Sequence, residues 1–285
     1  IMASMRDIKR RRDSIQSTEQ ITKAMKLVST VKLQKSRAKA EESKPYYDLM
    51  YDTVRSMLRR SGNIEHKYLK AGGSGRKAVI AITSNRGLAG GYNNNIIRLI
   101  NGDERLKPED TDVYAIGRKG KDGLLRKGYT IAQDYSEVIN GPLYRDAADI
   151  TLELLDAFKQ NKIGEIYLAY TSFKNTVLHV PTLRKLLPVQ MEDSGENGEL
   201  TQMNYEPDEE QALDFIVPKY MSSLIYGALL EAVASENGAR MTAMDSATTN
   251  AEEMIEELGL AYNRARQGSI TQELTEIIAG ANAIS

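Results

Sequence analysis

The sequence of 285 residues has no cysteine and no tryptophan, and it has only 7 prolines and 3 phenylalanines. Without cysteine, the chain has no disulfide scaffold, no thiol nucleophile and no zinc ribbon. No apolar run reaches the roughly 18 residues that a membrane-spanning helix needs. The charged pair Arg6 and Asp7 stands where a secretory signal would be apolar, so we expect no such signal. With 41% hydrophobic residues, the chain can still bury a core.

The formal net charge of −1 conceals an uneven distribution of charge along the chain. Residues 1–60 carry 15 basic and 7 acidic side chains, whereas residues 206–285 carry 4 basic and 14 acidic ones. The near-neutral total is therefore the cancellation of a basic amino-terminal segment by an acidic carboxy-terminal one. This asymmetry is more informative than the total charge.

Two long helices are predicted at the ends of the chain. In residues 4–60 the apolar side chains are spaced mostly by three, four or seven, and the only proline is Pro45, where we expect a kink. This helix would be roughly 85 Å long. Residues 207–210 have the proline and acids of a helix start, and we expect Pro218 to break or kink the segment early. Residues 219–283 then allow a helix of roughly 100 Å. Opposite charge and comparable length favour antiparallel pairing of the two helices.

The middle of the chain has the alternating strands and helices of an α/β fold, which favours a mainly parallel sheet. Strands are predicted at residues 77–83, 113–117, 129–132 and 165–173, with a hairpin partner at 176–180, and helices at 93–101 and 143–161. The expected fold class is α/β with long helices: an antiparallel two-helix coiled coil from the N- and C-terminal helices plus a central Rossmann-like α/β domain. The expected division is a coiled-coil helix, a linker, the central domain and a second coiled-coil helix, at residues 1–60, 61–74, 75–205 and 206–285.

Motifs for chemistry are mostly missing. The glycine-bearing turn at residues 87–91 lies where a nucleotide phosphate can bind, but its spacing is not G-x-G-x-x-G. We therefore interpret it as a tight strand-to-helix turn. His66 and His179 have no acidic or hydroxyl neighbours at catalytic spacing, so we expect surface or rim positions for both rather than a metal site or triad.

The charged clusters are typical of solvated helix faces. The glutamates within residues 252–257 look like paired carboxylates, yet on a helix such residues most often face water. The basic residues 9–12 could contact nucleic acid, but an acidic helix alongside would repel phosphate. Two functions beyond packing stay open: a nucleotide-binding enzyme using residues 75–180, and a coiled-coil scaffold or nucleic-acid-binding arm led by residues 9–12.

Four stretches carry more specific information, namely residues 20–28, 83–90, 239–244 and 262–274. They read QITKAMKLV, TSNRGLAG, ARMTAM and YNRARQGSITQEL. Together they resemble the gamma subunits of F-type ATP synthases, and the resemblance covers essentially the whole chain. Two departures are Asn85, where an aspartate is more usual, and Gly268, where an alanine is common. A glycine inside a long helix costs up to about 1 kcal/mol relative to alanine.

The resemblance implies a rotor shaft rather than a catalyst. Its coiled coil would stand inside a ring of alternating alpha and beta subunits, whose beta sites make or hydrolyse ATP. Its α/β domain would contact the epsilon subunit and the c-ring, which is turned by proton flow. The chain itself would hold no cofactor, since ATP, ADP and Mg²⁺ belong to alpha and beta, and it would bind no nucleic acid. It would lie peripherally at the cytoplasmic face of a bacterial plasma membrane.

The resemblance also assigns contact residues. Those expected to face an acidic lever loop of beta are Lys23, Met25, Lys26 and Arg240, although Met25 is equally explained as filling of the coiled coil. Those expected in an upper contact region with alpha and beta are Arg266, Gln267 and Thr271. Residues 270–284 would fill an apolar sleeve at the top of the ring of alpha and beta subunits. Tyr205 and Glu206 would lie on the side that faces the c-ring and epsilon.

Overall fold

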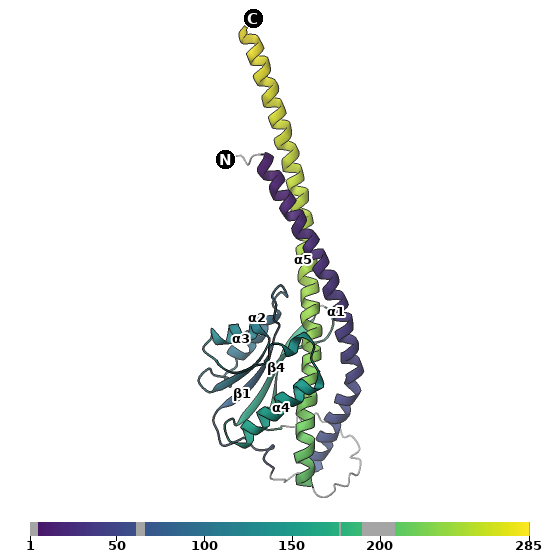
Figure 1. Cartoon of the computed structure of the whole chain (residues 1–285), viewed down its shortest axis with the longest axis vertical. Helices are drawn as coiled ribbons and strands as arrows, with labels where there is room; N and C mark the ends of the chain where they lie inside the picture. Colours follow the sequence, from purple (N-terminus) through teal and green to yellow (C-terminus); the bar gives the residue numbers. More distant parts are fainter. Residues whose placement is uncertain (1–4, 61–65, 177, 190–208, 285) are drawn as a thin grey trace. The chain divides into compact units, whose positions relative to one another are not determined.

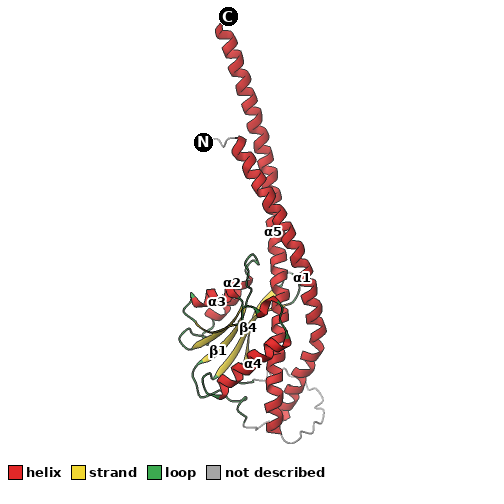
Figure 2. Cartoon of the chain, viewed as in Figure 1, coloured by secondary structure: helices red, strands yellow, loops and turns green. Residues whose placement is uncertain are grey.

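The computed structural model describes residues 5–60, 66–176, 178–189 and 209–284, and helices and strands account for most of them (Figure 2). The chain divides into two compact units. One, the terminal unit, contains the described residues up to Ser29 and those from Met241 onwards. The other, the α/β unit, contains those from Thr30 to Arg240.

Two long helices, α1 (Met5–Arg60) and α5 (Glu209–Ile284), each contribute to both units. This confirms the predicted pair. Of the two outcomes expected at Pro218, a break of the second helix is wrong, because α5 is continuous from Glu209, and a kink stays a prediction. Leu213 and Val217 before the proline and Met221 after it are fully buried in one core, so packing holds both turns in place. Residues 207–208 of the expected helix start lie outside the described residues.

In the terminal unit, α1 and α5 pair in antiparallel fashion. The Arg12 guanidinium lies 5.8 Å from the centroid of the Tyr262 ring, and the hydroxyls of Thr22 and Thr248 are 2.8 Å apart. Residue numbers that rise along α1 therefore meet numbers that fall along α5, which confirms the expected orientation.

The other unit contains a five-stranded sheet in the order β3-β2-β1-β4-β5. The strands are β1 (Lys77–Ile82), β2 (Thr111–Ile116), β3 (Thr130–Asp134), β4 (Glu165–Phe173) and β5 (His179–Leu187). The first four run parallel, and β5 pairs antiparallel with β4. The mainly parallel, Rossmann-like sheet is thereby confirmed. The hairpin partner is β5, which is longer than the predicted residues 176–180 because the pairing continues to Leu187.

Helices cover both faces of this sheet (Figure 1). They are α2 (Tyr92–Asn101), α3 (Arg118–Leu125) and α4 (Tyr144–Lys159), with a short 3-10 turn at Val138–Asn140. One core joins the sheet to α4 and to the part of α5 between Leu213 and Ala232, and a second joins it to α2 and α3. The core on one face of the sheet is therefore complete only when α5 lies on it.

Helix α3 was not predicted, since two glycines weaken its sequence signal. The structure explains both of them. A Cβ atom on Gly120 would lie 2.6 Å from Thr83 Oγ1, and one on Gly123 would lie 2.3 Å from Ile97 Cδ1. Close packing therefore selects glycine here at the expense of helix propensity.

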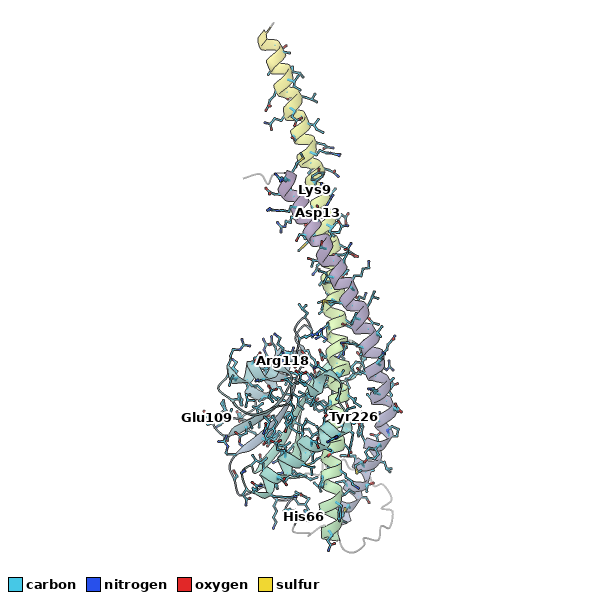
Figure 3. All side chains as sticks on the ribbon, viewed as in Figure 1. Lys9, Asp13, His66, Glu109, Arg118 and Tyr226 are labelled. Carbon is cyan, nitrogen blue, oxygen red and sulfur yellow. The ribbon has the colours of Figure 1, made fainter. Side chains whose placement is uncertain are left out.

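His66, labelled in Figure 3, corrects the expectation of a surface or rim position, because its side chain is buried. Its Nε2 lies 3.3 Å from Asp214 Oδ1, and its Nδ1 accepts a hydrogen bond from the Tyr68 backbone at 3.3 Å. Lys67 Nζ lies 2.7 Å from the same carboxylate and, against the effect of burial, lowers the pKa of Asp214. The acidic partner is distant in sequence, so local spacing could not reveal it. His179 is half-buried, as expected of a rim position.

Candidate partner interface

Three of the candidate contact residues lie on α1 in the terminal unit. Lys23 is exposed, with Nζ 3.7 Å from Glu19 Oε1 one turn away. Lys26 reaches across the helix pair and places Nζ 2.5 Å from Asp245 Oδ1. Met25 is half-buried, a position compatible with both a packing and a contact role. The sequence motif therefore presents one accessible lysine and one that α5 already engages.

The seam beneath these residues is made of small and polar side chains. Thr22, Ser29, Thr248 and Ala251 are all buried there. The Thr22 hydroxyl donates to the Glu19 carbonyl, and the Thr248 hydroxyl donates to the Met244 carbonyl at 2.8 Å. The two hydroxyls are also within hydrogen-bonding distance of each other. Small side chains allow the two backbones to approach closely, and the local hydrogen bonds satisfy the buried hydroxyls.

The upper candidates lie on α5, in its last turns before Ile284. Arg266 and Gln267 are exposed, as is Thr271, whose hydroxyl donates to the Gln267 carbonyl at 2.9 Å. Large apolar side chains beside them are also exposed: Ile270 at 49%, Leu274 at 55%, Ile277 at 68% and Ile278 at 59%. An exposed apolar stripe of this kind is typical of a surface that a partner covers.

Arg240 belongs to the other unit and is mostly covered by the chain itself. Its side chain is only 11% exposed, and Nη2 lies 2.7 Å from Glu236 Oε1. The same nitrogen donates to the Gly87 carbonyl at 3.3 Å. Arg240 thus ties α5 to the loop that follows β1. Sequence reasoning missed Glu236, although its spacing of four residues from Arg240 on a helix was a usable signal.

The loop after β1 is held by its own hydrogen bonds. The Ser84 backbone donates to Asn93 Oδ1 at 2.9 Å, and the Tyr92 hydroxyl donates to the Ala232 carbonyl on α5 at 3.1 Å. Leu88, with a φ of 62°, is 64% exposed on this otherwise fixed loop. Burial raises the pKa of Tyr92 well above its usual value, which keeps the phenol a neutral donor.

Asn85 uses both ends of its amide in the same loop. Its Nδ2 donates to the Ser136 carbonyl at 2.7 Å, and its Oδ1 accepts from the Arg118 backbone at 3.0 Å. The amide group at the position where an aspartate was expected therefore has a structural use. Because the helix-start amide of Arg118 is already bonded, it is not available to a phosphate.

Several sequence-based candidates are separated or undescribed. Lys23, Met25, Lys26, Arg266, Gln267 and Thr271 fall in the terminal unit, and Arg240 in the other. Tyr205 and Glu206 lie outside the described residues. The glutamates within residues 252–257 are exposed, as predicted for a solvated face. Among the described residues, no helix is long and apolar enough to cross a membrane, and no group of three His, Asp or Glu side chains could hold a metal ion.

Curated proteins of known family resemble this chain along its whole length. The ATP synthase gamma chain of Lachnoclostridium phytofermentans is 68% identical over 292 residues, covering 100% of both chains. That of Alkaliphilus metalliredigens is 42% identical, covering 98% of each. The sodium ion specific gamma chain of Acetobacterium woodii is 38% identical, covering 99% of each.

Solved structures share the fold at low identity. A chain of the Euglena gracilis mitochondrial ATP synthase aligns with a TM-score of 0.69 at 19% identity, covering 98% of this chain and 94% of that one. A chain of the Tetrahymena thermophila central stalk and c-ring structure aligns with a TM-score of 0.57 at 23% identity, covering 80% and 99%. The model of the ATP synthase family matches residues 4–284. On this family match and the identity to curated relatives, the chain belongs to the family of ATP synthase gamma chains.

Proposed function

We propose that the chain is the central rotor shaft of an F-type ATP synthase, coupling proton-driven c-ring rotation to ATP synthesis or hydrolysis at the beta-subunit sites. The observation that carries the proposal is the full-length identity of 68% to an ATP synthase gamma chain. The exposed apolar end of α5, which needs a partner to cover it, agrees with this role.

The helices supply a means of transmitting torque. Helix α5 contributes to the α/β core between Leu213 and Ala232 and continues without interruption to Ile284. Rotation imposed on the α/β unit is therefore carried by a hydrogen-bonded helix rather than by a loop. An asymmetric shaft surface then contacts each beta subunit differently and shifts its conformational equilibrium, since a partner changes such an equilibrium only through differential contact.

Accessibility suggests how the candidate residues divide this work. Lys23 is exposed and suits direct contact with an acidic loop of beta, whereas Lys26 would have to leave Asp245 to do the same. Arg240 is mostly covered, so we assign it the role of holding the Gly87 loop beside the acidic lever loop of beta. The part of its side chain that stays exposed would contact that lever loop. Arg266, Gln267 and Thr271 would contact alpha and beta near the apolar sleeve around residues 270–284. Tyr205 and Glu206 would contact the c-ring or epsilon.

The same proposal includes a set of partners and a location. The chain carries no catalytic site or cofactor of its own, and ATP, ADP and Mg²⁺ are bound by alpha and beta. Its partners are alpha, beta, epsilon and the c-ring, and it binds no nucleic acid. It lies at the cytoplasmic face of a bacterial plasma membrane, associated through the complex.

Coexpression with alpha and beta subunits tests the proposal. We expect a stable complex that hydrolyses ATP and contains this chain, whereas alpha and beta expressed alone should give little. A matched pair of variants sharpens the test: a chain ending at residue 269 lacks the exposed apolar end, and Lys127→Gln alters an exposed lysine of the α/β unit. The first should weaken assembly and the second should not. Failure of the intact chain to enter an ATP-hydrolysing complex refutes the rotor role.

A further inference from the structure

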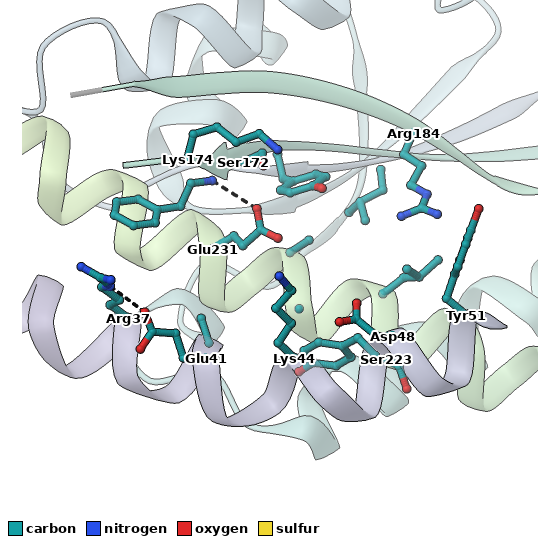
Figure 4. Close-up of a pocket in the computed structure, with 18 of the residues that line it drawn as sticks. Arg37, Glu41, Lys44, Asp48, Tyr51, Ser172, Lys174, Arg184, Ser223 and Glu231 are labelled. Atoms are coloured by element: carbon teal, nitrogen blue, oxygen red, sulfur yellow. Dashed lines mark hydrogen bonds and ion pairs between the residues drawn. The ribbon is translucent and has the colours of Figure 1, made fainter. Parts of the chain in front are cut away.

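A cavity of about 780 Å³ opens within the unit of residues 30–240 (Figure 4). It is bounded by α1, by α5 and by the face of β4 and β5 that carries Leu168, Tyr170 and Arg184. None of the proposed rotor contacts lines it. Its volume falls within the roughly 300–1,000 Å³ of small-molecule sites in proteins.

Small residues on the facing helices create this space. Ala40 of α1 and Gly227 and Ala228 of α5 line the cavity. A Cβ atom on Gly227 would make ordinary contact with the Tyr47 ring, at 3.4 Å. Neither the backbone conformation nor a close contact therefore requires glycine at position 227. Larger side chains at these three positions would fill the cavity.

Three cations from three different elements line the cavity. Lys44 lies on α1, Lys174 follows β4 and Arg184 lies on β5 (Figure 4). Among the described residues, the ion pairs within 4.0 Å include the neighbouring Arg37 and Lys185 but none of these three side chains. No carboxylate of the described residues therefore neutralises these three charges at close range, although Arg184 also contacts Tyr220.

Two of the three carboxylates that line the same cavity accept hydrogen bonds from other groups of the chain. Glu41 Oε1 accepts from Arg37 Nε at 2.7 Å, and Glu231 Oε2 accepts from the Phe173 backbone at 3.1 Å. Asp48 is the remaining acidic residue of the lining. With four cations and three carboxylates in the lining, the net charge of the cavity wall is +1, which favours an anion.

Aromatic rings form much of the wall beside the cations. The Arg184 guanidinium lies 5.6 Å from the centroid of the Tyr51 ring, so the positive charge and a flat apolar surface are adjacent. The Tyr47 hydroxyl is buried, with Ser43 of the preceding turn of α1 as its neighbour. Burial raises the pKa of Tyr47 to about 12, so this phenol remains a neutral donor near pH 7.

We propose that this cavity binds a small aromatic anion, with its negative group among Lys44, Lys174 and Arg184 and its ring against Tyr47 and Tyr51. The proposal concerns a ligand site separate from the rotor contacts, and it stands whether or not those contacts are correct. An anion with a ring uses both features of the site. A neutral ring lacks the attraction of the cations, and an inorganic anion lacks contact with the rings.

A pair of fluorescent probes tests this on the purified full chain. The aromatic sulfonate 8-anilinonaphthalene-1-sulfonate has the required ring and charge, and N-phenyl-1-naphthylamine has the same rings without the sulfonate. We expect the sulfonate to saturate one site per chain and the neutral probe to bind at least tenfold more weakly. Inorganic sulfate should compete only weakly.

Substitutions locate the bound probe. Lys174→Gln and Arg184→Gln should each weaken sulfonate binding at least fivefold, Ala228→Leu should abolish the site by filling it, and the exposed Lys127→Gln should change nothing. Thermal unfolding of each variant identifies any loss of fold, and the two glutamine variants alone suffice if Ala228→Leu does not fold. Equal affinity for both probes, or unchanged sulfonate binding in both glutamine variants, would overturn the proposal.

Discussion

Gly238 of α5 packs against the ring of His179, and we predict that alanine at this position destabilises the protein. A Cβ atom there would lie 2.7 Å from His179 Cε1 and 3.2 Å from Nε2. The ring has little room to retreat because it lies against Phe173, with 5.8 Å between the ring centroids. Overpacking of this kind costs about 1–3 kcal/mol. Alanine recovers about 1 kcal/mol of helix propensity, so the expected net loss is about 1 kcal/mol.

Gly259 provides a matched control in the same helix. No atom lies within 4 Å of the position that its Cβ would occupy, so Gly259→Ala should gain the propensity without a clash. The two variants should therefore differ by about 2 kcal/mol. For chains of about 150–250 residues this corresponds to about 4–8 °C in Tm, measured by far-UV circular dichroism on the purified full chain.

A second substitution separates the clash from other effects. His179→Ala removes the ring, so Gly238→Ala in that background should become neutral or stabilising. The coupling between the two positions is then the free-energy difference that the cycle measures. If Gly238→Ala is as stable as Gly259→Ala in the wild-type background, the inferred contact does not constrain the helix.

Three further predictions concern the same unit. Burial lowers the pKa of His179 more than the Thr176 carbonyl raises it, so the unfolded chain binds more protons than the folded one below about pH 6.5. The contribution of His179 to stability should therefore be complete above that pH and fall towards pH 5. His179→Gln should remove this part of the pH dependence of the urea midpoint. Arg240→Ala leaves the nearly buried Glu236 unpaired and should cost about 2 kcal/mol of stability. Adding Glu236→Gln to the same chain should restore part of that loss. In membranes, a rotor role also predicts that the Arg240→Ala variant pumps fewer protons per ATP. Asn85→Asp removes the donor to the Ser136 carbonyl and should cost about 1–2 kcal/mol in chemical denaturation, whereas an unchanged midpoint would show that the bond contributes nothing.

Local pattern was sufficient for the regular elements of this fold. The three-four spacing of apolar residues and the single proline in residues 4–60 predicted α1, and the alternation of strands and helices in the middle of the chain predicted β1. Those signals are local, because helix and strand periodicity depend on which side of a single element is buried. The same holds for the exposed glutamates of residues 252–257, whose helix position is enough to place them in water.

The elements and contacts that escaped prediction depend on distant partners. Gly120 and Gly123 weaken α3 as a helix, and only their approach to Thr83 and Ile97 explains them. The hydrogen bond from Arg240 to the carbonyl of Gly87, far away in sequence, was also not predicted. The cavity between Lys44 and Arg184 is likewise a product of tertiary packing, since no motif in either segment points to a ligand.

The place of α5 in the sheet core has a consequence for biosynthesis. Leu213, Val217, Met221 and Ile225 cover apolar side chains of strands that precede them in the chain. A ribosome therefore releases every strand of the sheet before it supplies the helix that seals one face. Until then α4 covers that face only in part, and the core around Ile80, Ile82 and Leu168 stays incomplete, which is a condition under which nascent chains aggregate or recruit chaperones. Folding of the α/β unit is for this reason a late event, completed only after α5 has emerged.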